Sequence, residues 1–180
     1  NMVVKFNPQA MVTLALGRKP EAIDFLERFL ERGERNEVQF PVGTTGTYGR
    51  PTDVTWDSKD NIFVADGYSN SRVVKLGKDG SWVKSLGTRG AGPNQFNTVH
   101  AITSDAKNNI YVADRGNRRI QVFDTDLNPV KIISNVGAPW TLCTSPATGN
   151  SPQYLFSGDG NGKLYKLDMN GDLVGWAQTS

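Results

Sequence analysis

The chain has 180 residues, which is the length of one ordinary domain. Its 20 lysines and arginines against 18 aspartates and glutamates leave a formal net charge of +2, so charge gives no case for nucleic acid or an anionic membrane surface as a partner. The single cysteine, Cys143, excludes an internal disulfide, and no apolar run in the sequence is long enough to span a membrane.

A hairpin pattern of fifteen residues recurs four times along the chain. Each copy consists of an apolar strand, a polar turn and a second apolar strand. The copies cover residues 3–17, 73–87, 120–134 and 164–178. A hairpin repeated in this way indicates a radial or linear array, because each unit buries its apolar face against its neighbours.

The repeated unit is longer than this hairpin. Residues 50–72 and 98–119, which precede the second and third copies, each contain a short strand, a polar turn and a further strand reading IFVA or IYVA. Four short strands per period, separated by Gly, Asn and Asp turns, are typical of a β-propeller blade. We therefore predict an all-β propeller with blades over residues 50–96, 97–136 and 137–180.

The chain begins within a blade pattern, because its first hairpin lacks the two strands that precede the later ones. We interpret residues 1–17 as half a blade, which gives about three and a half blades, whereas closed propellers typically have about four to eight. We therefore expect the sequence to be part of a larger ring. An alternative is that two copies of the chain self-associate through their open blade edges.

Residues 18–49 interrupt the repeat with a different periodicity. Pro20 suits the first turn of a helix, and Gly33 suits its end. Apolar residues recur between them at helical spacing: Ala22, Ile23, Leu26, Phe29 and Leu30. The pattern predicts one amphipathic helix inserted between blades. We interpret it as a lid packed on the ring or as part of a rim that faces a substrate.

An aspartate follows the second strand of each predicted blade, at Asp66, Asp114 and Asp159. These positions are separated by 48 residues (114 − 66) and by 45 residues (159 − 114). Arg72 and Arg119 also recur, each directly before a strand. Because repetition favours a structural role, we interpret the aspartates as acceptors for backbone N–H groups in the turns and the arginines as links between blades.

Other Asp- and Asn-rich turns, which read DSKDN, DTDLN and DMNGD, superficially resemble calcium-binding loops. They lack the remaining ligands at the spacing that such a loop requires. Calcium is therefore a weak alternative among the cofactors that the sequence suggests.

His100 is the one histidine of the chain, and it stands at the start of a blade's first strand, in TVHAIT. Thr52 and Trp140 occupy the equivalent positions of the neighbouring blades, and the first strand of a propeller blade lines the central channel. His100 is interpreted either as a polar channel residue satisfied by nearby backbone or as one ligand of an axial metal. One histidine cannot form a zinc site by itself, because zinc takes three or four protein ligands.

Two further side chains stand where the repeat is irregular. Tyr68 lies in ADGYSNSR, whereas the corresponding turn of the next blade, ADRGNRR, is one residue shorter and has no aromatic residue. Its ring either covers the turn or projects its phenol into the axial mouth as a proton-transfer group. Arg115 stands where the preceding blade has Gly67. It either pairs with an acidic neighbour on the surface or holds a carboxylate in bidentate fashion.

The segments FVADGYSNSRVVKL and YVADRGNRRIQVFD resemble NHL repeats, a propeller-blade family with an apolar strand, an aspartate, Asn-x-Arg and another apolar strand. The resemblance covers nearly the whole chain outside residues 18–49. A narrower resemblance relates RPTDVTW, IFVADGYSNSR, PNQFNTVHAIT and IYVADRGNRRIQVF, in this order, to the six-bladed peptidyl-α-hydroxyglycine α-amidating lyases. We therefore expect an NHL-type β-propeller that has six blades when complete.

This narrower resemblance implies a chemistry and a location. Lyases of the family cleave a C-terminal α-hydroxyglycine to a peptide amide and glyoxylate, with zinc held by histidines from different blades. The resemblance implies that His100 binds zinc, that Tyr68 acts on the hydroxyl group and that Arg115 holds the carboxylate. It also implies a secreted or periplasmic protein. Val99 and Ser69 depart from the family, which has proline before the histidine and cysteine after the tyrosine.

Two functions of different classes follow from these residues. The first is a metal-dependent lyase, of which this chain alone would be inactive because its zinc shell is incomplete. The second is a non-catalytic NHL propeller that acts as a protein- or ligand-binding scaffold, with His100 lining the channel. In both cases we expect a peptide or small-molecule ligand at the propeller axis.

Overall fold

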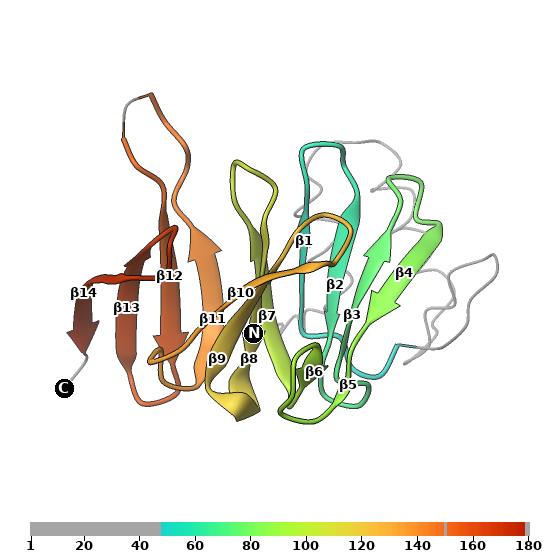
Figure 1. The fold of residues 1–180 in the computed structure, drawn as a ribbon, viewed down its shortest axis with the longest axis horizontal. Helices are drawn as coiled ribbons and strands as arrows, with labels where there is room; N and C mark the ends of the chain where they lie inside the picture. Colours follow the sequence, from blue (N-terminus) through green and yellow to red (C-terminus); the bar gives the residue numbers. More distant parts are fainter. Residues whose placement is uncertain (1–47, 150, 179–180) are drawn as a thin grey trace, which may run out of the picture.

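The computed structural model describes residues 48–149 and 151–178 of the chain. The half blade predicted at residues 1–17 and the helix predicted between Pro20 and Gly33 lie outside the described residues. The described part forms three four-stranded sheets and one two-stranded pair. Figure 1 shows the three sheets side by side, in the order in which the chain forms them.

Each large sheet is an antiparallel meander whose strands follow one another along the chain. The first contains β1 (Asp53–Trp56), β2 (Ile62–Asp66), β3 (Arg72–Leu76) and β4 (Trp82–Leu86). The second contains β7 (Val99–Ser104), β8 (Ile110–Asp114), β9 (Arg119–Phe123) and β10 (Pro129–Ile133). The third contains β11 (Pro139–Thr144), β12 (Tyr154–Asp159), β13 (Lys163–Asp168) and β14 (Leu173–Gln178). These sheets confirm the prediction of an all-β propeller built from four-stranded blades.

The link between the first two blades contains a short parallel pair, β5 (Thr88–Arg89) and β6 (Gln95–Phe96). One turn of 3-10 helix, η1 (Arg115–Asn117), follows β8. The described residues contain no α-helix, and none of their helical segments could cross a membrane.

The central strands of the blades are the most deeply buried. All five residues of β2 and all five of β8 are buried. Burial on both faces of the strand explains why their sequences contain the continuous apolar runs IFVA and IYVA. The outermost strands β4, β10 and β14 are largely exposed, which agrees with their mixed composition. Burial therefore decreases from the middle of each blade towards its outer edge.

Apolar side chains from adjacent blades form shared cores. Phe63 and Val73 of the first blade pack in one cluster with Val112 and Phe123 of the second. A second cluster joins the other face of the second blade to the third. It includes Tyr111, Ile120, Val122, Leu155, Tyr165 and Leu167. Because the second blade buries both of its faces against neighbours, the stacking of blades supplies the hydrophobic stabilisation that one sheet lacks.

The first strands of successive blades lie next to each other, since β7 contacts both β1 and β11. The β7–β8 register shifts between Val99 and Ala101, and the β11–β12 register shifts between Pro139 and Thr141. His100 and Trp140 are the residues inside these irregularities. A bulge of this kind redirects a side chain and recurs next to functional sites.

The turn after β8 is held by a buried carboxylate. Asp114 is 0% exposed, and its Oδ2 accepts hydrogen bonds from Nε of Arg119 at 2.8 Å and Nδ2 of Asn117 at 2.8 Å. Its Oδ1 accepts the backbone N–H of Asn97 at 2.7 Å. The guanidinium of Arg119 also donates to the backbone carbonyls of residues 91, 92 and 95, which belong to the link between blades. This network supports the interpretation of Asp114 and Arg119 as architectural residues.

The first blade repeats the arrangement, but the third does not. Asp66 is 0% exposed and accepts from Nε of Arg72 at 2.9 Å, from Nδ2 of Asn70 and from the backbone N–H of Gly49. Asp159 is only partly buried and accepts backbone N–H groups from its own turn, at residues 161 and 163. The aspartate therefore recurs in three blades, but the buried ion pair with arginine is present in two of them.

Candidate functional site

Tyr68, His100 and Arg115 come together at one end of the first two blades. Tyr68 follows β2, His100 lies at the start of β7, and Arg115 follows β8. In the antiparallel meander these points all lie at the same end of the sheets, at the bottom of Figure 1. The indole of Trp140, from the start of β11, completes the group. We call these four residues the axial cluster, because they lie at or beside the adjoining first strands.

The imidazole of His100 is oriented by the next blade. Its Nδ1 lies 2.7 Å from the backbone carbonyl oxygen of Trp140. A carbonyl oxygen can only accept, so Nδ1 carries the proton and Nε2 of the neutral ring keeps its lone pair. The hydroxyl of Tyr68 lies 3.2 Å from Nε2 and is placed to donate to it. The cluster thus presents a phenol and an imidazole nitrogen joined by one hydrogen bond.

The environment of His100 favours its neutral form. Partial burial lowers the pKa of His100 from its ordinary value of 6.5, and the positive charge of Arg115 lowers the pKa further. The Trp140 carbonyl and the Asp53 carboxylate act in the opposite direction, without reversing the shift. At neutral pH the lone pair on Nε2 is therefore available to a proton donor or to a metal ion.

Arg115 is held by aromatic rings. Its guanidinium carbon lies 4.2 Å from the centroid of the Trp140 ring and 5.6 Å from that of Tyr68. The ion pairs among the described residues are formed by Arg72, Lys75 and Arg119. Arg115 forms none of them. Its N–H donors are therefore placed to receive a carboxylate from a ligand.

The exposed aromatic surface lies beside these donors. Tyr68 is 47% exposed and Trp140 is 42% exposed, although both carry large aromatic rings. The rings of His100 and Trp140 lie 4.8 Å apart between centroids, and those of Tyr68 and His100 lie 5.8 Å apart. The cluster therefore combines a guanidinium whose chemistry suits a carboxylate with aromatic faces that can contact an acyl or peptide group.

Sequence reasoning had not assigned a role to two residues near this site. Trp140 was recognised only as the positional equivalent of His100. Asp53 accepts the backbone N–H of Ile102 in the next blade at 2.9 Å, and burial is the main cause that raises its pKa. Both residues make contacts with the neighbouring blade, across 40 or more positions of sequence. The repeat pattern within one blade therefore could not predict these contacts.

His100 suits one position in the shell of a zinc ion but does not complete it. Its tautomer directs the Nε2 lone pair away from the backbone, and a backbone carbonyl orients the ring through Nδ1, as is usual for a metal-binding histidine. The described residues contain no group of three or more His, Cys, Asp or Glu side chains that could hold a metal. Any further ligands would have to come from outside the described residues.

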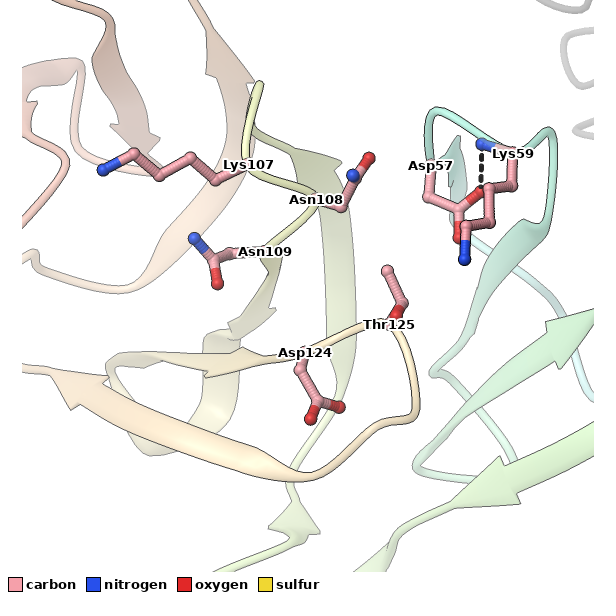
Figure 2. A pocket seen from close by; sticks show the side chains of 7 residues that line it. All are labelled: Asp57, Lys59, Lys107, Asn108, Asn109, Asp124 and Thr125. Carbon is pink, nitrogen blue, oxygen red and sulfur yellow. Dashed lines mark hydrogen bonds between the residues drawn. The ribbon is translucent and has the colours of Figure 1, made fainter.

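A cleft lies at the opposite end of the blades from the axial cluster. It has a volume of about 180 Å³ and lies between the turns of the first two blades. Figure 2 shows the side chains that line it: Asp57, Lys59, Lys107, Asn108, Asn109, Asp124 and Thr125. The Oδ1 of Asp57 accepts the backbone N–H groups of residues 59 and 61, and Asp124 makes the corresponding bonds in its own turn. These carboxylates are engaged in fixing turns, which gives the DSKDN and DTDLN segments a structural explanation.

Comparison with known proteins relates the chain to propellers. A family model described as 6-bladed beta-propeller matches residues 48–163. The chain is 34% identical over 109 residues to NHL repeat-containing protein 3 of Mus musculus, which covers 56% of this chain and 31% of that protein. It is 31% identical over 145 residues to a probable peptidyl-alpha-hydroxyglycine alpha-amidating lyase of Caenorhabditis elegans, which covers 74% of this chain and 41% of that protein.

A third relative is the peptidyl-glycine alpha-amidating monooxygenase of Mus musculus. It is 40% identical over 92 residues, which cover 48% of this chain and 9% of that protein. The chain thus spans between 9% and 41% of the length of these three relatives.

Solved structures agree on the fold. A chain of Kuenenia stuttgartiensis hydrazine synthase superposes with a TM-score of 0.59 at 16% identity, covering 79% of this chain and 39% of that one. A streptogramin B lyase structure superposes with a TM-score of 0.57 at 12% identity, covering 80% of this chain and 44% of that one. At such identities the likeness concerns the arrangement of blades alone.

Proposed function

The chain belongs to the 6-bladed beta-propeller family, with NHL-type repeats close to those of the amidating lyases, and from this premise we propose that its axial cluster serves cleavage of α-hydroxyglycine peptides to an amide and glyoxylate. The observation that carries the proposal is the meeting of Tyr68, His100 and Arg115, which come from two blades. These side chains offer a proton-transfer group, an imidazole lone pair and a carboxylate receptor within one site.

The proposed reaction needs no oxidant or reductant. The α-hydroxyl group loses its proton, the C–N bond breaks as the carbonyl group of glyoxylate forms, and the amide nitrogen takes up a proton. Tyr68 relays this proton through its Oη to the leaving amide nitrogen, while Nε2 of His100, 3.2 Å from that oxygen, keeps its lone pair for the metal. Arg115 holds the substrate carboxylate with paired N–H donors and so orients the bond that breaks.

Zinc is proposed for the intact natural protein, with His100 as one ligand through Nε2. When bound, the ion would act as a Lewis acid that polarises an oxygen of the substrate. Since His100 is the one histidine of the 180 residues and the resembling lyases hold zinc with several histidines, we expect this chain by itself to be inactive. Binding of the carboxylate by Arg115 does not depend on the ion and can be measured on this chain.

The decisive assay supplies α-hydroxyhippurate to the intact natural protein with zinc and measures the release of glyoxylate. Tyr68→Phe removes the proton-transfer group and is expected to lower the rate by about 100-fold or more. Arg115→Gln is expected to raise KM. Arg89→Gln changes an exposed arginine in β5 and serves as the control that keeps activity. Absence of glyoxylate from the zinc-loaded wild-type protein would rule out the lyase function.

A scaffold function is the second candidate, and the exposed aromatic faces beside Arg115 favour it. The relatives of this chain include NHL repeat-containing protein 3, to which it is similar over 109 residues. In this case the axial cluster binds a carboxylate-bearing peptide or small molecule without turnover. Binding of hippurate that requires Arg115, together with no release of glyoxylate from α-hydroxyhippurate, would select this function over the lyase.

We also propose that the isolated chain associates with a second copy of itself through the outer face of the third blade. Leu164 in β13 lies on this face, opposite to the face of Tyr165 and Leu167 that packs on the second blade, and it is 45% exposed. By strand register, Leu164 corresponds to Ile120 of the second blade, which is buried against the next blade. A face built to pack on a blade is best covered by another blade, so a second copy is the occupant that its shape favours.

A further inference from the structure

Trp140 touches two of the three proposed functional side chains. Its backbone carbonyl accepts the Nδ1–H of His100, and its indole ring lies 4.8 Å from the imidazole between centroids. The same indole lies 4.2 Å from the guanidinium carbon of Arg115, which is closer than the Tyr68 ring at 5.6 Å. One residue of the third blade is therefore in contact with both the imidazole and the cation of the site.

The position of Arg115 depends on stacking against an aromatic ring, whereas Arg72 and Arg119 are held in place by ion pairs. Arg72 and Arg119 are each fixed by a fully buried aspartate at 2.9 and 2.8 Å. Arg115 has no such carboxylate among the ion pairs of the described residues, and its side chain lies partly exposed at the end of β8. Stacking on an aromatic face orients a guanidinium plane and leaves its N–H edge open to a ligand.

The third blade leaves space for the indole. Gly160 occupies the position that follows Asp159, as Arg115 follows Asp114. A Cβ atom at Gly160 would lie 2.5 Å from Nε1 of Trp140 and 2.9 Å from its Cε2, which is closer than such atoms pack. The indole is therefore confined by the backbone of Gly160 and cannot shift towards it, so its place beside Arg115 is set by the fold of its own blade.

We propose that Trp140 is a positioning residue for Arg115, which holds the guanidinium by cation–π stacking so that its N–H edge receives the carboxylate of the ligand. The inference rests on the proposed function in one respect, namely that Arg115 binds a carboxylate. Gly160 belongs to the same arrangement, because its lack of a side chain leaves the space that the indole occupies.

Binding of hippurate to the 180-residue chain tests the proposal, with uncharged hippuramide as the comparison ligand. Isothermal titration should show hippurate bound more tightly than hippuramide by the wild-type chain. Trp140→Leu should weaken hippurate binding by about tenfold, the effect expected for loss of a partly desolvated cation–π contact. Trp140→Phe retains an aromatic face and should recover most of the loss. Trp176→Leu removes another exposed tryptophan, which stacks on Lys163, and should change nothing.

A double-mutant cycle separates positioning from general damage. In an Arg115→Gln background, Trp140→Leu should cause no further loss of hippurate affinity, because the group that it positions is gone. Gly160→Ala, which displaces the indole without removing it, should resemble Trp140→Leu. The inference is overturned if Trp140→Leu binds hippurate as the wild-type chain does, or if its loss persists in the Arg115→Gln background.

A measurement without ligand distinguishes failure of this inference from failure of the proposed function. If the wild-type chain does not bind hippurate, the carboxylate site is wrong, but the stacking can still be tested by NMR. The side-chain protons of Arg115 should be shifted upfield by the indole ring current in the wild-type chain and should return to ordinary shifts in Trp140→Leu. Unchanged shifts would show that Trp140 does not position Arg115, whatever the ligand.

Discussion

The backbone carbonyl of Trp140 accepts the Nδ1–H of His100 over 2.7 Å, and this bond decides which imidazole nitrogen faces Tyr68. The two residues occupy the same position in successive blades, within the irregular register at the start of β7 and β11. Since the carbonyl belongs to the backbone, no substitution of the Trp140 side chain removes it. The tautomer of His100 is therefore determined by the packing of one blade on the next.

The lowered pKa of His100 predicts how stability depends on pH. The folded chain binds a proton at His100 less readily than the unfolded chain, whose histidine titrates near 6.5. The stability that this group contributes is therefore fully present above pH 6.5 and is lost as the pH falls from there through the lower folded-state pKa. Urea unfolding measured between pH 7.5 and pH 5 should show a decline in the wild-type chain that is smaller in His100→Phe. An equal decline in both chains would contradict the lowered pKa.

Removal of the buried Asp114 carboxylate should destabilise the chain strongly. Asp114→Ala leaves the guanidinium of Arg119 without its charged partner and the backbone N–H of Asn97 without its acceptor. The free energy of unfolding should fall by about 3 to 5 kcal/mol, as for breaking one half of a buried ion pair. Asp159→Ala, at the same position of the third blade, should cost about 1 kcal/mol. Equal losses in urea titrations of the two variants would show that the buried pair is not the source of the difference.

Gly67 is a position that cannot accept a side chain. A Cβ atom there would lie 1.7 Å from the backbone carbonyl oxygen of Val99. Gly67→Ala should therefore force the Tyr68 turn away from β7, lengthen the contact between Tyr68 and His100 and lower the free energy of unfolding by more than about 2 kcal/mol. Gly175→Ala is the matched control, since no atom lies within 4 Å of its added Cβ. Thermal unfolding that treats the two variants alike would contradict the close approach.

Zinc content offers a direct test of the metal proposal. The intact natural protein should carry about one zinc ion per chain by mass spectrometry, and His100→Ala should lose it. Tyr154→Phe, which alters a tyrosine of the third blade outside the axial cluster, should keep the ion. A wild-type protein without zinc after exposure to the ion would remove the metal from the proposed mechanism.

Equivalent positions in the second and third blades should respond differently to truncation. Ile120 is 0% exposed, whereas Leu164 is 45% exposed. Ile120→Ala should lower the free energy of unfolding by about 2 to 5 kcal/mol, and Leu164→Ala by less than about 1 kcal/mol in the monomer.

The same face gives a test of self-association. Sedimentation should show dimers of the isolated chain that a Leu164→Glu substitution reduces, because a charge replaces an apolar group on the proposed contact face. Val130→Glu places a charge at an exposed position on the outer strand of the second blade, leaves the proposed face intact and serves as the control. A wild-type chain that remains monomeric at high concentration would contradict the proposed contact.

Much of the fold follows from the sequence, because its determinants are local. The repeated hairpins at 73–87, 120–134 and 164–178 correspond to the strand pairs β3–β4, β9–β10 and β13–β14. Turn residues and alternation of apolar side chains act within a few positions of each other, so four strands per blade could be predicted without knowing their neighbours. The family likewise follows from local motifs, as the match of the propeller model to residues 48–163 confirms.

The candidate site depended on a different kind of information. Tyr68 and Arg115 stand out in the sequence because they depart from the repeat. Only the resemblance to the lyases assigns them with His100 to one site, since no spacing in the sequence brings the three together. The resemblance gave no role to Trp140, whose carbonyl reaches His100 across 40 positions of sequence. Sequence by itself determined the blades, their turns and the chemical types of the candidate residues. Only the tertiary structure decided the tautomer of His100 and the stacking of Arg115, because these depend on how one blade packs against the next.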